Sequence, residues 1–269
     1  PAGNTASPDT AERPIVIQGA MPVETETLVA ALDHPEEVHV QGWTFWSGTV
    51  AGHPVVVSRS LKGMTNAAAA TALAIERFHP AAIINQGTAG GHDPALHTAD
   101  IVVGTTVVNI GAFKTGARAE GAGTDFATWY PMDLLRTEGS AGQDPSAWVM
   151  HKFPGDAGLL AAAAAAKASY TAGHVVEGVI GSSDVWNSEL DRIARMHTAF
   201  GTSAEEMEAA SAAQVAELSH VPFLAVRVLS NNITNGEPYN TTVAGPCQQY
   251  VLALVRAYAE HGQVGTTKR

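Results

Sequence analysis

Short apolar runs that end in glycine or small polar residues recur along the chain and predict the strands of a buried sheet. Runs of this kind cover residues 15–18, 81–84, 100–108, 174–180 and 223–229. Continuous apolar runs are typical of strands covered on both faces. Between and after them, patterns typical of helices cover residues 66–78, 157–169, 188–197, 205–218 and 246–260. This alternation predicts an α/β fold.

The first half of the chain shows how the strands connect. Residues 43–50 and 54–60 predict a strand pair that turns at Ala51-Gly52, and the helix over 66–78 then leads back to the strand over 81–84. Such a βαβ unit implies a largely parallel inner sheet. Upstream of the pair, His34 and His39 bracket what reads as an acidic turn.

A glycine-rich stretch follows the strand over 81–84 and is expected to form the floor of a ligand site. Gly87, Gly90 and Gly91 allow backbone conformations and close approaches that bulkier residues do not. We interpret the stretch as a tight turn at the carboxyl end of a strand, where open α/β sheets bind their ligands. A plain loop without a ligand is the alternative interpretation.

Carboxylates stand in two places that suit such a site. Glu24 lies just beyond the end of the strand over 15–18. Glu205, Glu206 and Glu208 fall in the first turn of the helix expected over 205–218, where the helix dipole favours negative charge. Glu208 has apolar neighbours, and a buried carboxylate needs partners that alanines cannot provide. The hydroxyl groups of a ligand would supply the hydrogen bonds that Glu208 needs.

Composition sets the domain organisation. At 269 residues with 45% hydrophobic content, the chain suits one large domain, which we place over residues 14–262 after a disordered or processed lead over 1–13. Residues 111–154 lack clear periodicity. Their apolar centre, Trp129-Tyr130-Pro131-Met132, could close over a ligand, pack on a neighbouring subunit or anchor the segment to its own core.

Net charge and residue types limit the classes of binding partner and cofactor. With 15 basic against 26 acidic residues, the net charge of −11 argues against nucleic acid or an anionic membrane as partner, so a small molecule is expected. No apolar run approaches the roughly 20 residues of a membrane span. Cys247 is the single cysteine and reads as structural, and the histidines show no metal-ligand spacing, so neither metal nor cofactor is expected. The polar start without methionine suggests an exported protein, periplasmic or secreted; cytoplasmic placement is the alternative.

Four motifs together resemble one family. They are Gly19-Ala20-Met21-Pro22-Val23-Glu24, Ile84-Asn85-Gln86-Gly87-Thr88-Ala89-Gly90-Gly91, Glu206-Met207-Glu208-Ala209 and Arg227-Val228-Leu229-Ser230-Asn231. In this order they are similar to motifs of the purine nucleoside phosphorylase and 5′-methylthioadenosine/S-adenosylhomocysteine nucleosidase superfamily. The resemblance runs from about residue 15 to about 258 and leaves out 111–154. It implies a three-layer α/β/α fold with a central mixed sheet, cleavage of a purine from ribose, and a homodimer or larger assembly.

The resemblance also implies roles for individual residues. Glu24 would activate water, and Glu208 would bind the ribose hydroxyls while Met207 packs under the sugar. Trp186 would stack on the purine, and Asn187 beside it could read the edge of the base. The remaining substrate contacts would come from Ser60, Thr88, Ala89, Gly90 and Glu206.

One position departs from the nucleosidase pattern. Asn231 stands where those enzymes have an aspartic acid that protonates the leaving base, and an amide has no proton to transfer. Asp184 could supply the proton instead. Because an amide offers a donor and an acceptor together, we expect a preference for 6-oxopurine nucleosides of the inosine and guanosine type.

Other activities stay open. A 5′-methylthioadenosine/S-adenosylhomocysteine nucleosidase is the first alternative to the 6-oxopurine nucleosidase. Phosphorolysis would need arginines around phosphate; Asn85 stands where phosphorylases of the superfamily have one, although Arg59 keeps the possibility open. A nucleoside-binding or storage protein with little turnover is a third class, against which the presence of both Glu24 and Glu208 argues.

Overall fold

The computed structural model describes residues 12–136 and 149–266. Most of the lead expected over 1–13 lies outside this range, as do residues 137–148 of the unpatterned segment. In chain order the helices are α1 (Glu26–Ala30), α2 (Met64–Phe78), α3 (Ala157–Ala166), α4 (Leu190–Phe200), α5 (Ala209–Leu218) and α6 (Ala244–Thr266). No helix among the described residues is long and apolar enough to cross a membrane.

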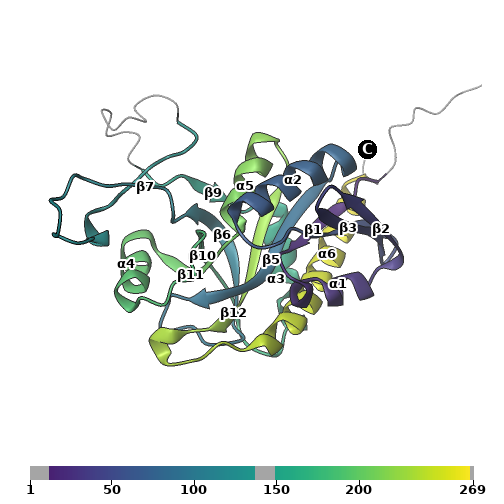
Figure 1. Ribbon diagram of the computed structural model, residues 1–269. Helices are drawn as coiled ribbons and strands as arrows, with labels where there is room; N and C mark the ends of the chain where they lie inside the picture. The colour runs from purple at the N-terminus through teal and green to yellow at the C-terminus, as the bar shows by residue number, and fades with distance from the viewer. Residues whose placement is uncertain (1–11, 137–148, 267–269) are drawn as a thin grey trace, which may run out of the picture.

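One mixed sheet of ten strands organises the described chain (Figure 1). Its strands are β1 (Ile15–Gly19), β2 (Asp33–Val40), β3 (Trp43–Val50), β4 (His53–Arg59), β5 (Ala82–Gly91), β6 (Ile101–Asn109), β9 (Lys152–Pro154), β10 (Val175–Ser182), β11 (Thr202–Glu206) and β12 (Phe223–Asn231). Their order is β11-β10-β6-β12-β5-β1-β4-β3-β2, with β9 paired to β6. Parallel pairs join β5 to β1 and β12, whereas β12 meets β6 in antiparallel fashion. The expected α/β fold with a large mixed sheet is confirmed.

Strand β11 gives the sheet its particular shape. It pairs in parallel with β10 and, at its other side, in antiparallel fashion with the end of β5. The strands β11, β10, β6, β12 and β5 therefore form a closed ring, from which β1, β4, β3 and β2 extend.

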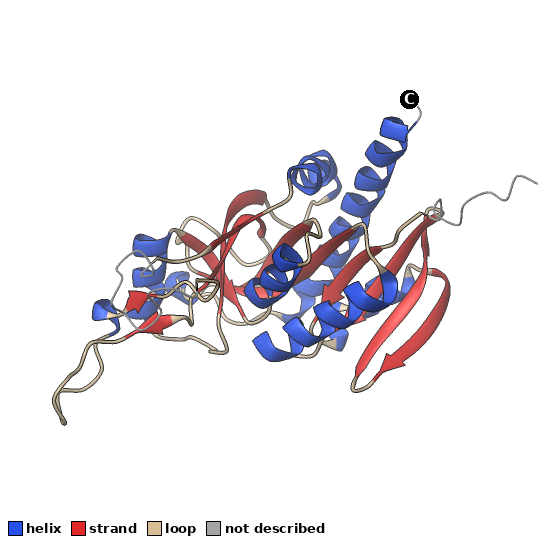
Figure 2. Cartoon of the chain, turned by 90° about the horizontal axis from the view of Figure 1, so that it is seen from above, coloured by secondary structure: helices blue, strands red, loops and turns tan. Residues whose placement is uncertain are grey.

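Alternating side chains of the central strands divide the core between the two faces of the sheet. Ile15, Ile17 and Ile84 pack with helices α3 and α6, whereas Val16 and Ile83 pack with helices α2 and α5. This follows from the period of two along a strand, and it explains why these runs are apolar throughout. Helices accordingly lie on both sides of the strands (Figure 2).

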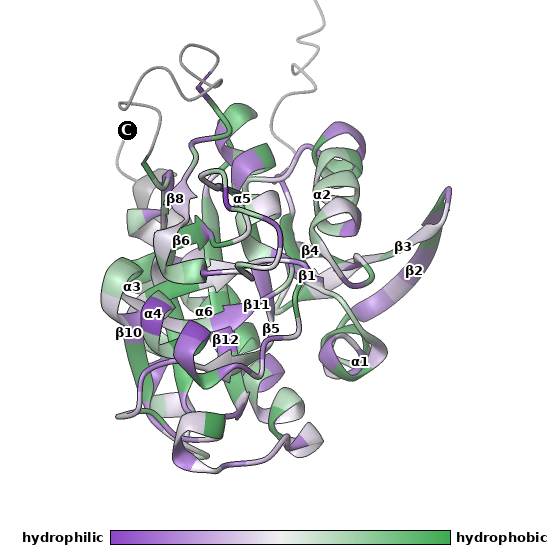
Figure 3. Ribbon diagram, turned by 60° about the vertical axis from the view of Figure 1, so that its left-hand side comes forward, coloured by the Kyte–Doolittle hydropathy of each residue, from purple (hydrophilic) through white to green (hydrophobic). Residues whose placement is uncertain are grey.

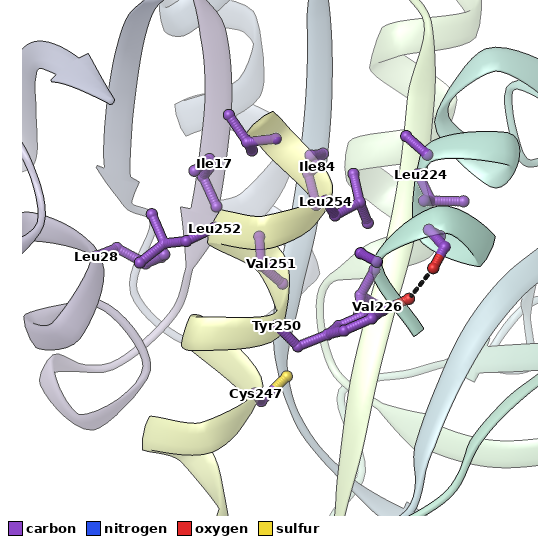
Figure 4. Packing of buried hydrophobic residues seen from close by; sticks show 14 of the residues in the cluster. Ile17, Leu28, Ile84, Leu224, Val226, Cys247, Tyr250, Val251, Leu252 and Leu254 are labelled. Carbon is purple, nitrogen blue, oxygen red and sulfur yellow. Dashed lines mark hydrogen bonds between the residues drawn. The ribbon is translucent and has the colours of Figure 1, made fainter. Parts of the chain in front are cut away.

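Helix α6 supplies much of the first core. Val251 and Leu254 point toward Ile17, Ile84 and Val226, and Cys247 lies buried one turn earlier (Figure 4). The hydroxyl of Tyr250, on the same helix, donates a hydrogen bond of 2.8 Å to the carbonyl of Ala163 in α3. Fully burying a Leu, Ile or Val side chain contributes about 1.5–3 kcal/mol to the free energy of folding, so this helix stabilises the sheet on one face.

Three local expectations are corrected. Residues His34 and His39 belong to strand β2, not to a turn; β2 is polar, largely exposed and set against β3 (Figure 3). The glycines after residue 86 do not form a turn, because backbone pairing with β12 and β11 keeps β5 extended to Gly91. Glu205 and Glu206 end strand β11 and do not open a helix, since α5 begins only at Ala209.

The described part of the 111–154 segment carries the short strands β7 (Phe113–Lys114) and β8 (Tyr130–Pro131). Its Trp129 ring lies 6.1 Å from that of Phe113 and 5.2 Å from that of Phe126, centroid to centroid. Phe113 and Phe126 pack on the small buried cluster that contains Met196. Of the three interpretations of this apolar centre, anchoring to its own core fits Trp129.

Candidate functional site

A pocket lies where the ends of strands β1, β5, β10, β11 and β12 come together. It is lined by Ala20, Met21, Glu24, Lys62, Thr88, Ala89, Gly90, Val185, Trp186, Asn187, Glu205, Glu206, Met207, Glu208, Ser230, Asn231 and Tyr239. The pocket thus brings together most residues that the sequence pointed to. Seven lining residues were not among the predicted site residues, although four of them stand inside or beside the motifs. They are Ala20, Met21, Glu205 and Ser230, and then Lys62, Val185 and Tyr239.

Glu24 is held in one orientation at the base of the pocket. Its Oε2 accepts hydrogen bonds from the backbone N–H groups of Ala20 (3.0 Å) and Met21 (3.1 Å). Its Oε1 accepts from the N–H (2.8 Å) and the hydroxyl (2.9 Å) of Thr88. Four donors around a buried carboxylate fix its orientation. The carboxylate of Glu24 therefore has one defined position on the pocket.

Gly87 makes room for this carboxylate. A Cβ at position 87 would lie 2.6 Å from Oε1 of Glu24 and 2.9 Å from Nη1 of Arg227, both closer than real contacts allow. We expect Gly87→Ala to displace Glu24, to destabilise the protein by about 1–3 kcal/mol and to abolish most turnover. Urea unfolding and a nucleosidase assay would measure both effects. Gly90→Ala is the control for stability, since its Cβ would meet only Asn231, at 3.5 Å; equal destabilisation of the two variants would contradict the argument.

Arg227 is a buried cation under the pocket. Its Nη2 lies 2.8 Å from Oε2 of Glu206 and its Nη1 lies 3.3 Å from Oε1 of Glu208. Burial alone would lower the pKa of Arg227, but the carboxylates of Glu206, Glu208 and Glu24 raise it above its ordinary value. Arg227 also donates to the side chain of Asn85. Sequence reasoning gave Arg227 no role beyond the motif.

Glu206 has more hydrogen-bond and ion-pair partners within the protein than Glu208 has. Glu206 accepts from the backbone N–H groups of Glu208 (2.8 Å) and Ala209 (2.9 Å) and from the hydroxyl of Ser182, besides pairing with Arg227. These contacts place Glu206 between Arg227 and the start of α5. Glu208 has two partners: it pairs with Arg227, and its Oε2 accepts from the N–H of Gly63 at 3.0 Å.

Glu208 therefore has partners within the protein, contrary to the expectation that only a ligand could supply them. They come from the loop after β4 and from β12, which the local sequence around Glu208 could not reveal. The pKa of Glu208 is raised to about 7, chiefly by burial and also by Glu206 and Glu24, against the lowering effects of Arg227 and Gly63. A carboxyl of this kind changes charge near neutral pH.

The other end of the pocket carries aromatic and amide side chains. The Trp186 ring is 69% exposed and lies edge-on to Tyr239, with 5.6 Å between centroids. Oδ1 of Asn231 accepts from the Ser230 hydroxyl at 3.0 Å. Nδ2 of Asn187 is buried without a hydrogen-bond partner among the described residues. These groups offer a face and polar edges to a planar ligand.

Two expected site residues lie elsewhere. Asp184 does not line the pocket: its Oδ1 accepts from the backbone N–H of Met64 at 2.8 Å, because the first turn of α2 has free N–H groups. The hydroxyl of Ser60 is turned to the carbonyl of Leu61, at 2.9 Å. Among the described residues, no group of three or more His, Cys, Asp or Glu side chains is arranged to hold a metal ion.

Comparisons with known proteins identify the family. A family model described as "Phosphorylase superfamily" matches residues 14–258. A 5′-methylthioadenosine/S-adenosylhomocysteine nucleosidase from Shewanella pealeana is 35% identical over 229 residues, which are 83% of this chain and 88% of that protein. One from Bacillus thuringiensis is 32% identical over 218 residues, 81% of this chain and 85% of that protein.

Solved structures are similar over nearly the whole chain. The nucleosidase of the same name from Neisseria meningitidis, in complex with methylthio-immucillin-A, has a TM-score of 0.74 at 26% identity and covers 91% of this chain and 99% of its own. The enzyme from Colwellia psychrerythraea, in complex with adenine, has a TM-score of 0.73 at 28% identity and covers 92% of this chain and 96% of its own. A futalosine hydrolase from Helicobacter pylori shares the fold, with a TM-score of 0.73 at 22% identity.

Proposed function

The chain belongs to the phosphorylase superfamily, and we propose that it hydrolyses the N-glycosidic bond of 5′-methylthioadenosine and S-adenosylhomocysteine. The observation that carries the proposal is the placement of Glu24 and Glu208 on one pocket whose other end carries Trp186 and Asn231. The names of relatives at 32–35% identity support the same substrate class.

In the proposed reaction each carboxylate has one task. Glu24, held by four donors, accepts the proton of a water molecule that attacks C1′ of the sugar. Glu208, held between Gly63 and Arg227, accepts hydrogen bonds from the ribose hydroxyls. As the C1′–N9 bond breaks, the sugar becomes oxocarbenium-like and the bonding electron pair leaves with the purine. The fixed negative charges stabilise that cationic sugar.

The expected preference for 6-oxopurine nucleosides is wrong, because the relatives at 32–35% identity and the neighbours from Neisseria meningitidis and Colwellia psychrerythraea are named as 5′-methylthioadenosine/S-adenosylhomocysteine nucleosidases. The error was in the direction assumed for the amide. An asparagine that donates from Nδ2 to N7 and accepts at Oδ1 from the 6-amino group matches adenine with two hydrogen bonds. Oδ1 of Asn231 accepts one bond from Ser230 and retains a lone pair for a second.

Water is the proposed nucleophile, because no arginine among the described residues lines the pocket, where it could bind phosphate. Nε of Arg59 donates to the hydroxyl of Thr25 at 3.0 Å, and its guanidinium lies over the Trp46 ring, so it is turned away from the pocket. The amide of Asn85 is engaged with Arg227 and Gln18. Among the described residues that line the pocket, Lys62 is the one cationic side chain, and none is an arginine. A phosphate-binding site would need several arginines.

The test is a direct assay of the purified protein. We expect adenine to be released from 5′-methylthioadenosine and S-adenosylhomocysteine at equal rates with and without phosphate, and inosine to be a poorer substrate. Faster cleavage of inosine would contradict the substrate class. A requirement for phosphate would make the enzyme a phosphorylase, and the absence of turnover on all three would favour a binding or storage protein.

A further inference from the structure

A buried acid–imidazole pair lies behind the purine end of the pocket. Glu205, at the end of β11, lines the pocket and is 7% exposed, and His92, just after β5, is 2% exposed. Nε2 of His92 lies 3.5 Å from Oε2 of Glu205, and neither atom has a hydrogen-bond partner among the described residues. Nδ1 of His92 lies 2.7 Å from the hydroxyl oxygen of Thr202, which orients the ring.

Glu205 differs from the other carboxylates of the site. Glu24, Glu206 and Glu208 each accept at least two hydrogen bonds or ion pairs, whereas no described residue donates a hydrogen bond to Glu205. A buried carboxylate without donors is costly. Nε2 of His92 faces Oε2 of Glu205, and the carboxyl group of Glu205 lines the pocket. A ligand in the pocket can therefore meet a carboxyl group that has no donor within the described protein.

Strand register places Glu205 beside the purine. Gly90 is aligned with Glu205 of β11 on one side and with Asn231 of β12 on the other. Strands lie about 4.8 Å apart, so the backbones of Glu205 and Asn231 stand roughly 10 Å apart with no side chain between them. Nδ2 of Asn231 reaches over Gly90, where it would lie 3.5 Å from an added Cβ. A purine bound over Gly90 would therefore lie between Asn231 and Glu205.

The reaction needs a proton that Asn231 cannot give. We propose that Glu205 is a further catalytic residue, the general acid that protonates the leaving purine, and that His92 is a positioning residue that holds Oε2 of Glu205 in place. The inference rests on the proposed function. The proton of the Glu205 carboxyl passes to a ring nitrogen of the purine other than N7, which accepts from Nδ2 of Asn231, and the purine retains the electron pair of the broken C1′–N9 bond. Water adds to C1′ and its proton goes to Glu24. After the products leave, Glu24 releases a proton to solvent and Glu205 takes one up.

The experiment compares two leaving groups in the intact protein. Adenine needs a proton to leave, whereas p-nitrophenolate leaves as a stable anion. For Glu205→Gln we expect kcat on 5′-methylthioadenosine to fall at least about 100-fold, while kcat on the p-nitrophenyl glycoside of 5-methylthioribose stays within about threefold. Glu177→Gln, an exposed change in the adjacent strand β10, is the matched control and should alter neither rate.

A parallel fall with both leaving groups would show a merely structural role and overturn the proposal, as would no fall with either. His92→Phe keeps a ring and removes both nitrogens; we expect it to lower kcat on methylthioadenosine with KM unchanged and the nitrophenyl rate retained. An equal loss on both substrates would remove His92 from the proposal. If the wild-type protein cleaves a different purine nucleoside, the proposed function fails, and the same comparison with that nucleoside still decides the role of Glu205.

Discussion

Replacing Glu24 by glutamine is expected to lower kcat on 5′-methylthioadenosine about 10²–10⁴-fold and to leave nucleoside affinity nearly unchanged. The carboxylate is the only group of the proposed mechanism that accepts the proton of water, and an amide cannot. Glutamine also places an NH2 group where Ala20, Met21 and Thr88 all present donors. The variant should therefore also lose about 1–3 kcal/mol of stability through an unpaired buried donor.

Single-turnover kinetics and equilibrium binding of the nucleoside would separate the two effects. Glu26→Gln is the matched control: it makes the same change of charge two residues away, on an exposed side chain of α1. Turnover within about tenfold of wild type in the Glu24 variant would exclude Glu24 as the base.

Glu208→Gln is expected to lower kcat/KM and to raise the free energy of unfolding above neutral pH. The pKa of Glu208 is raised from 4.5 to about 7, chiefly by burial. The folded protein therefore holds this proton more tightly than the unfolded chain does. The stability that results is complete below about pH 4.5 and is lost as the pH rises through about 7. Glutamine has no charge to bury, so it avoids this loss.

We expect Glu208→Gln to raise the free energy of unfolding by about 1–3 kcal/mol at alkaline pH and by little in acid, as measured by urea unfolding at both. The kcat/KM of the variant should fall about 10-fold to 150-fold, because hydrogen bonds from the ribose to a charged acceptor are worth about 1.5–3 kcal/mol. Glu26→Gln should show neither effect. A stability gain that is independent of pH would contradict the origin assigned to it.

The sequence predicted the parts of the site that lie within continuous motifs. Glu24 and Glu208 were found because each stands in a short stretch with recognisable neighbours. Strand β11 was missed because it owes its conformation to pairing with β10 and with β5, which lies more than 100 residues earlier in the chain, while local composition favours a helix. Asp184 was misplaced for a related reason, since the N–H that it caps belongs to α2. The chemistry of Asn231 depends on which way the amide faces, and residue type alone does not reveal that.

The closed strand ring has a consequence for folding. Glu24 and Thr88 come from the first third of the chain and Glu206 and Glu208 from the last third, and they meet only when β11 pairs with β5. Closing this loop has an entropic cost that precedes the gain from the contacts, and contacts between distant segments form slowly. We therefore expect activity to return in the last phase of refolding, after most helical structure has formed, so that a nascent chain gains a working site only when its final strands are available.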